Sequence, residues 1–516
     1  MQVISRINRI KMATPWDSDY VSTRLKERVW RQGWKTMYQG ITISSLITLL
    51  CLSSALAISY PDVARAQALD PDWTAPMDMT APETEGTDVS PVLLCDDYEN
   101  LHLLWGKTYE SGSALFYRND LTGRWSGPLD VVAMPDLTVA RLSADISMSG
   151  DTLHVVWQNS YIKGEVYYAR APLSSAADPR SWTSPVVLAY DVDSAGVKAG
   201  KGGELYLIYG TSDESGLRNS VQWITSLDGG LTWSDPATVY ETASAVPSTI
   251  AAGLAVDGIG RWFVTITIRS QEYGLYSEAG YIRSLDGGRS WQSYEVIARQ
   301  SEARPNISGA AAFTFGDNEV HQTWYDPRRM HRWSYDGGDT WRDPIEIMSL
   351  GAAFGGGNEL VKDSAGGLHV VTGVLGGIYS SHWDGSRWSA PELIDDRLRD
   401  WHGWRLEPCQ GDRLNVVYDD RLEDDSAIWY SSRQVNAPHI DQSPIPTSVA
   451  ESATESGSLE ASPTARPAAT AEPAPPVTER GPSATDRRAL APLLTPTVLV
   501  AVLISVALAF HKWRGP

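Results

Sequence analysis

The chain has 516 residues and a formal net charge of −20, from 43 Lys and Arg against 63 Asp and Glu. No basic segment interleaved with aromatic residues offsets this charge, so nucleic acid is excluded as the expected partner. The balance fits an exported surface protein.

Residues 1–68 predict a basic leader and an export signal. An apolar segment at 41–58 follows a stretch that contains several Lys and Arg residues. Both 64–66 and 66–68 place alanines at the small-x-small spacing of a cleavage site. The alternative is that 41–58 remains uncleaved and anchors the chain as a transmembrane segment.

A tryptophan then recurs every 47 to 58 residues, six of the seven copies within the phrase W-x-x-P. The seven are Trp73, Trp125, Trp182, Trp233, Trp291, Trp341 and Trp388. Between successive copies lies an apolar run that ends in an aromatic residue or its equivalent, as at 101–105 and 153–157. Each unit therefore reads as four short strands, and units of roughly 40 to 50 residues are typical of β-propeller blades.

Residues 69–436 are accordingly predicted to form an all-β propeller. Seven blades are favoured, and six are the alternative. The last unit has no W-x-x-P after its strands, while the first W-x-x-P, at Trp73, has no strands before it. We therefore expect the N-terminal strand to complete the final blade and to close the ring.

Two cysteines bear on this closure. Cys95 and Cys409 occupy matching positions at the end of the innermost strand in the first and last units. Closure makes these units neighbours, so the sequence predicts a disulfide across the seam, which an oxidising compartment permits. Two buried thiols are the alternative.

Three turns share the phrase S-x-D-G-G-x-[ST]-W. Asp accepts hydrogen bonds within its own turn, Gly supplies positive φ, and Trp packs against the sheet that the turn closes. The positions concerned are Ser226, Asp228, Gly230 and Trp233; Ser284, Asp286, Gly288 and Trp291; and Ser334, Asp336, Gly338 and Trp341. Three copies with matching flanks indicate a repeat architecture.

The C-terminal part of the chain predicts a tether. Residues 437–488 are rich in Pro, Ala, Ser and Thr and nearly devoid of aromatic residues, which predicts a disordered stalk. Residues 489–511 are long and apolar enough for a transmembrane helix, and the basic 512–516 predicts a short cytoplasmic tail. The propeller is therefore expected outside the cytoplasm, anchored in the cell membrane.

The repeated turn resembles the Asp-box, or bacterial neuraminidase repeat, of the sialidase-like propellers. The resemblance covers roughly 70–435 and implies that the boxes are structural, joining the third and fourth strands of a blade. It also implies that a ligand would bind at the opposite face. A sialidase grips a sugar carboxylate with arginines and uses a Tyr as nucleophile.

Charged and aromatic residues in the loops of that opposite face are the candidates for such a site. The candidates for substrate binding are Arg304, Arg328, Arg329, Arg421, Trp401 and His402. The candidates for catalysis are Tyr418, Tyr325 and Asp326. The family's R-I-P phrase is absent, and no Tyr–Glu pair can be assigned by motif.

No metal site or cofactor is expected, although carboxylates at 419–425 could hold calcium. Histidines recur at one strand position, which indicates packing, and these are His102, His154, His321 and His369. The sequence thus favours a membrane-anchored module that binds an extracellular glycan or a cell-envelope protein. The alternative is an exo-sialidase that acts on external sialoglycans.

Overall fold

The structure is a computed structural model. It describes residues 69–81, 86–109, 112–134, 143–159, 164–200, 202–243, 247–270, 277–301, 307–326, 328–348, 359–374, 377–397, 403–422 and 425–445. The described fold is all-β, with two single-turn 3₁₀ helices, η1 (Leu173–Ser175) and η2 (Pro179–Ser181), as its helical elements. The prediction of an all-β fold is confirmed.

The described strands form six sheets. The first sheet contains β2 (Thr87–Cys95), β3 (Leu101–Tyr109), β4 (Gly112–Asn119) and β5 (Leu129–Met134). A seven-stranded sheet contains β6 (Ser143–Ser149), β7 (Thr152–Gln158), β8 (Gly164–Pro172), β9 (Val186–Ala199), β10 (Leu205–Ser212), β11 (Arg218–Ser226) and β12 (Ala237–Ala243). Within it β9 pairs with β8 through its first half and with β10 through its second.

Three four-stranded sheets follow in chain order. They contain β13 (Ser248–Val256), β14 (Trp262–Ser270), β15 (Ser277–Ser284) and β16 (Glu295–Arg299); β17 (Ser308–Phe315), β18 (Glu319–Asp326), β19 (Arg328–Ser334) and β20 (Ile345–Met348); and β21 (Glu359–Lys362), β22 (Leu368–Val374), β23 (Gly377–Trp383) and β24 (Glu392–Asp395). The closing sheet contains β25 (Trp404–Cys409), β26 (Arg413–Leu422), β27 (Asp425–Gln434) and β1 (Met77–Asp78).

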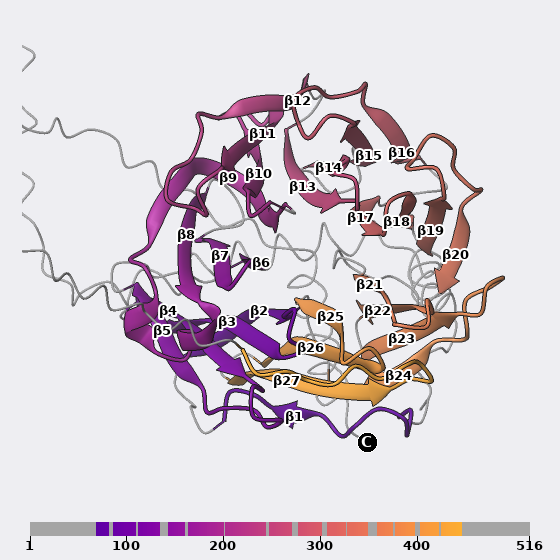
Figure 1. Ribbon diagram of the computed structural model, residues 1–516. Helices are drawn as coiled ribbons and strands as arrows, with labels where there is room; N and C mark the ends of the chain where they lie inside the picture. The colour runs from indigo at the N-terminus through magenta and orange to yellow at the C-terminus, as the bar shows by residue number, and fades with distance from the viewer. Residues whose placement is uncertain are drawn as a thin grey trace, which may run out of the picture. The chain divides into compact units, whose positions relative to one another are not determined.

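These sheets follow one another around a ring in a propeller-like arrangement (Figure 1). Their first strands, such as β2 and β25, lie toward the centre, and their last strands lie at the periphery. The outermost strand of the closing sheet comes from the start of the domain, because β1 pairs antiparallel with β27 and Met77 lies opposite Tyr430. The two ends of the domain therefore complete one sheet, as the W-x-x-P count predicted.

The recurring tryptophans join each unit to the preceding one. Six of them contact an aromatic ring on the third strand of the neighbouring unit, with centroids 5.1 to 6.3 Å apart. The pairs are Trp125–Tyr430, Trp182–Tyr117, Trp233–Tyr168, Trp291–Trp223, Trp341–Tyr281 and Trp388–His331. Trp73 takes the same place by donating from Nε1 to Ser380 Oγ at 3.2 Å. One repeated residue thus makes one repeated joint between sheets.

The three Asp boxes are held by the same hydrogen bonds. In the first, Asp228 accepts from the Ser226 hydroxyl at 2.8 Å and from the Thr232 hydroxyl at 2.6 Å, and the Gly230 N–H donates to Ser226 Oγ at 2.7 Å. The boxes at 284–291 and 334–341 repeat this pattern. These bonds, those from Thr232 above all, lower the pKa of Asp228 to about 2. Each box turns the third strand into the fourth, as the resemblance implied.

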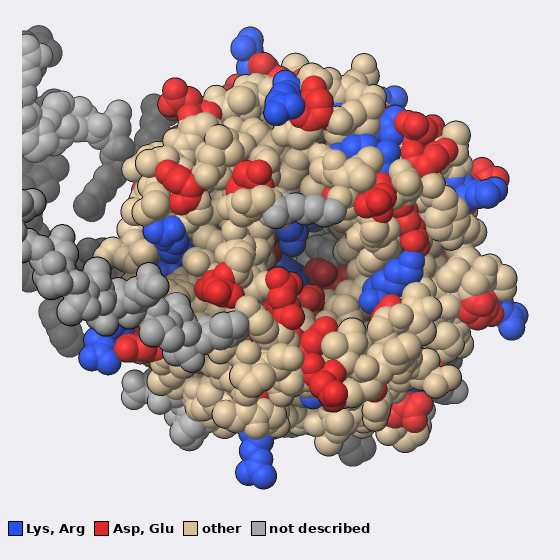
Figure 2. All heavy atoms as spheres, viewed as in Figure 1, with Lys and Arg blue, Asp and Glu red and all other residues tan. Residues whose placement is uncertain are grey.

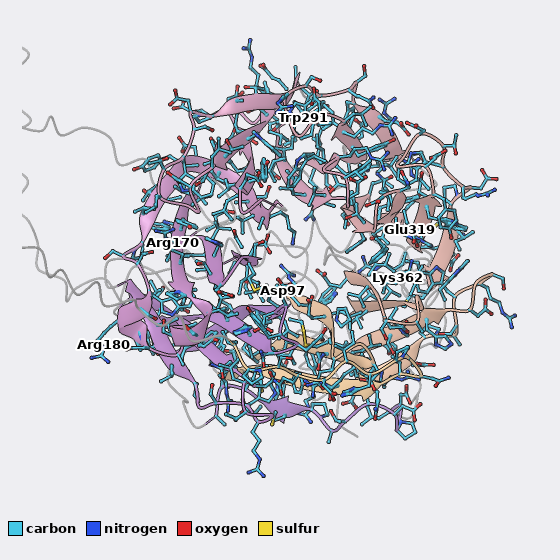
Figure 3. The ribbon with its side chains drawn as sticks, viewed as in Figure 1. Asp97, Arg170, Arg180, Trp291, Glu319 and Lys362 are labelled. Atoms are coloured by element: carbon cyan, nitrogen blue, oxygen red, sulfur yellow. A yellow bond between two sulfur atoms is a disulfide. The ribbon has the colours of Figure 1, made fainter. Side chains whose placement is uncertain are left out.

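We call the end of the ring that carries the boxes the turn face. It also carries the turns between first and second strands, such as 257–261 and 410–412. We call the opposite end, where β18 passes to β19 and β26 to β27, the loop face. On the turn face, Lys362 Nζ lies 2.5 Å from Glu319 Oε2 and links β21 to the start of β18 in the neighbouring sheet (Figure 3).

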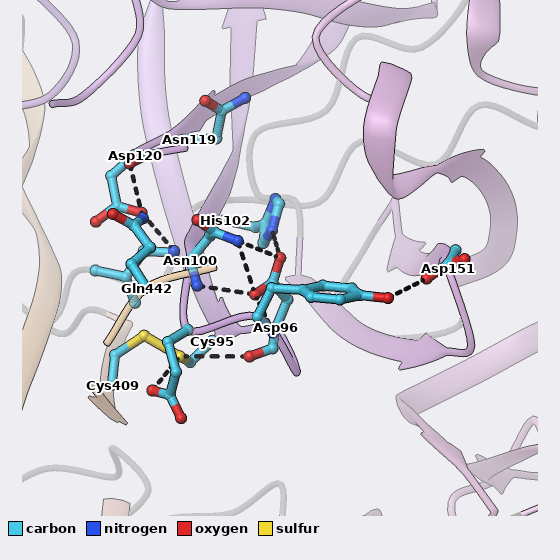
Figure 4. A network of polar contacts seen from close by, with 12 residues as sticks. Cys95, Asp96, Asn100, His102, Asn119, Asp120, Asp151, Cys409 and Gln442 are labelled. Atoms are coloured by element: carbon cyan, nitrogen blue, oxygen red, sulfur yellow. Dashed lines mark hydrogen bonds and ion pairs between the residues drawn. A yellow bond between two sulfur atoms is a disulfide. The ribbon is translucent and has the colours of Figure 1, made fainter. Parts of the chain in front are cut away.

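The seam between the closing sheet and the first sheet is cross-linked. Cys95 at the end of β2 and Cys409 at the end of β25 form a disulfide (Figure 4). Beside it, Asp96 accepts from the Asn100 backbone N–H at 2.8 Å and lies 3.1 Å from His102 Nε2. His102 Nδ1 lies 2.7 Å from the Tyr117 hydroxyl on β4, so the turn is fixed to the third strand.

The first residues of the predicted stalk, 437–445, are described by the structure. Residues 437–445, here called the strap, lie against the turn face and are held by backbone hydrogen bonds. The Ile440 N–H donates to Gln410 O at 2.9 Å, and the Ser443 N–H donates to Tyr98 O at 2.8 Å. A Pro- and Ser-containing segment can be ordered in this way because the sheet turns supply its acceptors.

Within the described part of the chain, no helix has the length and apolarity needed to cross a membrane. The predicted export signal, the transmembrane segments at 41–58 and 489–511, and the stalk after 445 lie outside the described residues.

Candidate functional site

The loop face holds those candidate residues that the structure describes. Tyr325, Asp326, Arg328 and Arg329 lie where β18 turns into β19, and Tyr418 lies in β26. Arg421 is also in β26, but its side chain is not described, and Arg304, Trp401 and His402 lie outside the described residues. The described candidates therefore lie in two places, the β18–β19 hairpin and the end of the closing sheet.

The two adjacent arginines of β19 have different environments. Arg328 is half-exposed and pairs with Glu346 on β20 at 3.0 Å. Arg329 is 2% exposed, and its guanidinium lies 5.2 Å from the centroid of the Tyr325 ring. Burial lowers the pKa of Arg329 to about 10. The strand alternation separates the two guanidiniums, so the structure does not bring them together as one grip.

Tyr418 has a carboxylate partner that no motif revealed. Its side chain is fully buried, and its hydroxyl donates to Asp395 Oδ2 at the end of β24. Burial first, and then the neighbouring Asp395 charge, raise the pKa of Tyr418 far above its usual range. In this setting the hydroxyl is a proton donor that holds the carboxylate.

The Asp395 carboxylate is shared with a cation. Arg397 Nε lies 3.4 Å from Asp395 Oδ1, and the backbone N–H of Arg397 donates to the same oxygen at 3.0 Å. The Arg397 guanidinium also lies 4.0 Å from the centroid of the Trp429 ring, a cation–π contact. Its side chain remains 38% exposed, so this arginine is accessible from solvent.

Three aromatic residues cross the closing sheet in a row beside this arginine. Trp404 lies opposite Tyr418, and Tyr418 lies opposite Trp429, so their side chains share one side of the sheet. The indole Nε1 atoms of Trp404 and Trp429 are buried and have no hydrogen-bond acceptor among the described residues. Two buried donors without an acceptor among the described residues thus lie next to an exposed guanidinium.

A second carboxylate–cation pair was missed by sequence reasoning. Asp88 on β2 lies 3.4 Å from Lys107 Nζ and accepts from Trp105 Nε1 at 2.7 Å. Burial raises the pKa of Asp88 to about 6, against the opposing effect of Lys107. The signal was the placement of Lys107 two residues after the Trp of an apolar second strand, the same placement as that of Asp326.

This pair lies at the seam of the ring. The Asp88 N–H donates to Ser426 Oγ at 2.6 Å, and Asp419 Oδ2 accepts from the Ser90 N–H at 3.1 Å. Of the carboxylates proposed for calcium, Asp419 is thus engaged in joining two sheets, and 423–424 lie outside the described residues.

The repeated histidines of the second strands bond to their own sheets. His154 Nδ1 lies 2.8 Å from the Tyr168 hydroxyl, and His321 Nδ1 lies 2.8 Å from His331 Nε2. Burial lowers the pKa of His154 to about 4. Cys95, Glu99 and Cys409 lie close enough to share a metal ion, but both sulfurs are consumed by the disulfide.

Seen along its axis, the ring is hollowed at its centre, and Asp and Glu as well as Lys and Arg side chains lie around the hollow (Figure 2). The innermost strands β21 and β25 carry Glu359 and Glu407, whose pKa values are both raised chiefly by burial. Arg405 Nη1 lies 3.4 Å from Glu359 Oε1 and neutralises part of this charge.

Comparison with known proteins identifies the repeats. Residues 166–350, which include all three Asp boxes, match the family model described as a BNR repeat-like domain. The sialidase-like resemblance that the boxes predicted is thereby confirmed over this region. No match was found among curated proteins.

Several solved structures are similar to this chain. A Dyadobacter fermentans protein of unknown function has 12% identity and a TM-score of 0.45, covering 71% of this chain and 100% of its own. A Trypanosoma rangeli sialidase mutant that displays trans-sialidase activity has 13% identity and a TM-score of 0.39, covering 71% and 60%. A Fusarium graminearum α-L-arabinofuranosidase mutant with an iminosugar inhibitor has 13% identity and a TM-score of 0.40, covering 57% and 92%.

Proposed function

We propose that this chain is a seven-bladed, membrane-anchored propeller that binds an anionic extracellular glycan at its loop face without cleaving it. The blade number is supported by the seven tryptophan joints, with β9 serving as the last strand of one blade and the first strand of the next. The membrane anchor is the predicted helix at 489–511.

The observation that carries the binding proposal is the cluster of Arg397, Trp429 and Trp404 beside Asp395. A guanidinium that is accessible and oriented by an indole face can bind the carboxylate of an acidic sugar. Trp429 is only partly buried, so its indole face can offer an apolar surface to the C–H face of a sugar ring.

The same cluster argues against catalysis. A tyrosine nucleophile must reach the substrate and lose its proton readily, whereas Tyr418 is fully buried with a raised pKa. Tyr325, the other candidate, is buried beneath the Arg329 guanidinium. Neither hydroxyl has the exposure that attack on a sugar carbon requires.

One observation favours a sialidase-type hydrolase as the second candidate function. The hydrogen bond from the Tyr418 hydroxyl to Asp395 pairs a tyrosine with a carboxylate, which is the chemistry of a tyrosine nucleophile and its base. This function requires that the hydroxyl become accessible.

The experiment compares binding and turnover in the full-length protein. We expect acidic glycans on an array to bind wild type, and Arg397→Ala to weaken binding by about 10-fold or more. Arg387→Ala, which removes an exposed arginine from a turn between β23 and β24, is the matched control and should leave binding unchanged. A fluorogenic sialoside should remain intact. Turnover that disappears in Tyr418→Phe would establish the hydrolase instead.

A further inference from the structure

The turn face contains a cavity of about 620 Å³ between three neighbouring units. Its walls are the turns that join β9 to β10, β13 to β14 and β17 to β18. This volume lies within the range of ligand sites, and the cavity is separate from the cluster around Arg397. Gly258 permits the close packing of its rim, since a Cβ there would lie 2.1 Å from Asp317 Oδ1.

The cavity has many acceptors and few donors. Three backbone N–H groups of the described lining residues already have acceptors: within their own turns Gly202 donates to Glu204 Oε2 and Ile259 donates to Asp257 Oδ1, and between two turns Gly258 donates to Gly316 O. Carbonyl and carboxylate oxygens therefore remain to face a ligand. A cavity of this kind selects a ligand that brings its own donors.

Two of the cavity carboxylates have no cationic partner among the described residues. Asp257 is neutralised by Arg261, whose Nε lies 2.6 Å from Asp257 Oδ2. In the part of the chain that the structure describes, Glu204 and the exposed Asp317 have no such ion pair. Tyr206 also lines the cavity, and the centroid of its ring is 4.3 Å from that of the buried Trp262. Carboxylates in a cavity that also holds an aromatic ring suit an ammonium or guanidinium group.

Charges around Tyr206 support this reading. Burial is the main cause that raises the pKa of Tyr206, the Glu204 charge adds to it, and the exposed Arg289 acts in the opposite direction. Arg289 lies on an Asp-box turn and is solvated, so it leaves the acidic character of the two opposing turns in place.

Large apolar side chains are exposed around the same half of the turn face. Ile259 lines the cavity and is 62% exposed, and Leu285 on the adjacent Asp box is 51% exposed. Further exposed apolar residues occupy the other two boxes: Leu227, Leu231 and Tyr335. Apolar groups gathered around an acidic cavity are typical of a surface that binds another polypeptide.

The strap shows how this face holds a polypeptide. It crosses the turns of the closing and first sheets and bonds to the Gln410 and Tyr98 carbonyls. Gln442 Nε2 donates to Asp120 O at 3.0 Å (Figure 4). The cavity lies on the equivalent turns of other units.

We propose that the turn face around the cavity of Glu204, Tyr206 and Asp317 binds an extended segment of a partner protein, with a Lys or Arg side chain in the cavity and apolar side chains against Ile259 and Leu285. The partner is defined by this chemistry, a basic residue flanked by aliphatic ones. The site is independent of glycan binding, because it lies on the opposite face and uses opposite charge.

The test uses the full-length protein and fluorescent decapeptides with Leu and Ile around a central Arg, Lys, norleucine or Glu. We expect Arg and Lys peptides to bind at least 10-fold more tightly than the norleucine peptide, and the Glu peptide not to bind. Glu204→Gln combined with Asp317→Asn should abolish that preference. The matched control is Asp235→Asn, an exposed acid outside the cavity.

Thermal unfolding checks that the double variant folds. We expect it to fold, because the amide oxygen that Glu204→Gln introduces can still accept the hydrogen bond from the Gly202 N–H. Equal affinity for the Arg and norleucine peptides would overturn the proposal. Binding of a neutral oligosaccharide that is lost in the double variant would also overturn it, and so would self-association of this chain that is lost there. Either result would assign the surface to a different occupant. Arg397→Ala should leave peptide binding at the cavity unchanged even where it loses glycan binding, so the two proposals can fail separately.

Discussion

The two faces of the ring are built from the same strands but in different ways. On the turn face the units repeat, and the boxes around Asp228, Asp286 and Asp336 have one hydrogen-bond pattern. On the loop face each unit ends in different residues, Tyr325 and Asp326 in one and Tyr418 with Asp395 in another. Repetition marks the residues that every unit needs for folding. Departure from it marks the residues that one unit contributes to a site.

The largest expected effect on stability comes from a substitution that weakens the closure of the ring. Trp73 is 5% exposed, and it is the one joint tryptophan supplied from the start of the domain. Trp73→Ala should lower the free energy of unfolding by about 3–5 kcal/mol, because it leaves a large cavity and frees the terminal strand. Urea denaturation followed by tryptophan fluorescence measures the loss. Leu69→Ala, at an exposed position before it, is the control and should stay within about 0.5 kcal/mol of wild type. An equal response of the two variants would mean that the ring does not depend on this joint.

The next effect is a pH dependence of stability that comes from Glu407 on the innermost strand β25. Burial raises the pKa of Glu407 to about 7 from an ordinary value of 4.5, although Lys198 opposes this shift. The folded protein therefore holds this proton more tightly than the unfolded chain, and the stability it contributes is lost as pH rises through about 7.

Glu407→Gln should accordingly raise the free energy of unfolding by about 2 kcal/mol at pH 8 and by almost nothing at pH 4. The glutamine carbonyl can still accept the Cys95 N–H, which donates to Glu407 Oε1 at 3.2 Å. Denaturant curves at the two pH values measure the difference, with the exposed Glu214→Gln as control. A gain that is the same at both pH values would show that the carboxyl does not titrate in this range.

The same contrast between faces explains how far the sequence could lead. The tryptophans and Asp boxes repeat, so their spacing predicted the strands, the closure by β1 and the proximity of Cys95 to Cys409. The Tyr418–Asp395 bond joins residues from neighbouring units and occurs once, so neither spacing nor composition could reveal it. The strap was missed for a related reason, since its Pro and Ser content resembles a linker and its acceptors are distant in sequence.

The smallest effect tests whether a box stabilises the fold as a charged turn. Asp228 accepts four local hydrogen bonds from Ser226, Leu231 and Thr232, and its pKa is lowered to about 2. Asp228→Ala should lower the melting temperature at pH 7 by about 2 °C, because the turn loses its acceptors while the rest of the sheet is unchanged.

A depressed carboxyl pKa contributes stability above the ordinary value near 4, and this contribution is lost as pH falls toward 2. The gap in melting temperature between wild type and Asp228→Ala should therefore narrow as the pH is lowered from 5 to about 2.5. Asp235→Ala, at an exposed position two residues after the box, is the control and should show no gap at either pH. A gap for Asp228→Ala that persists undiminished at low pH would assign the role of the box to the shape of its turn. The turn face would then owe its uniformity to glycine and tryptophan, with the carboxylate contributing nothing as a charge.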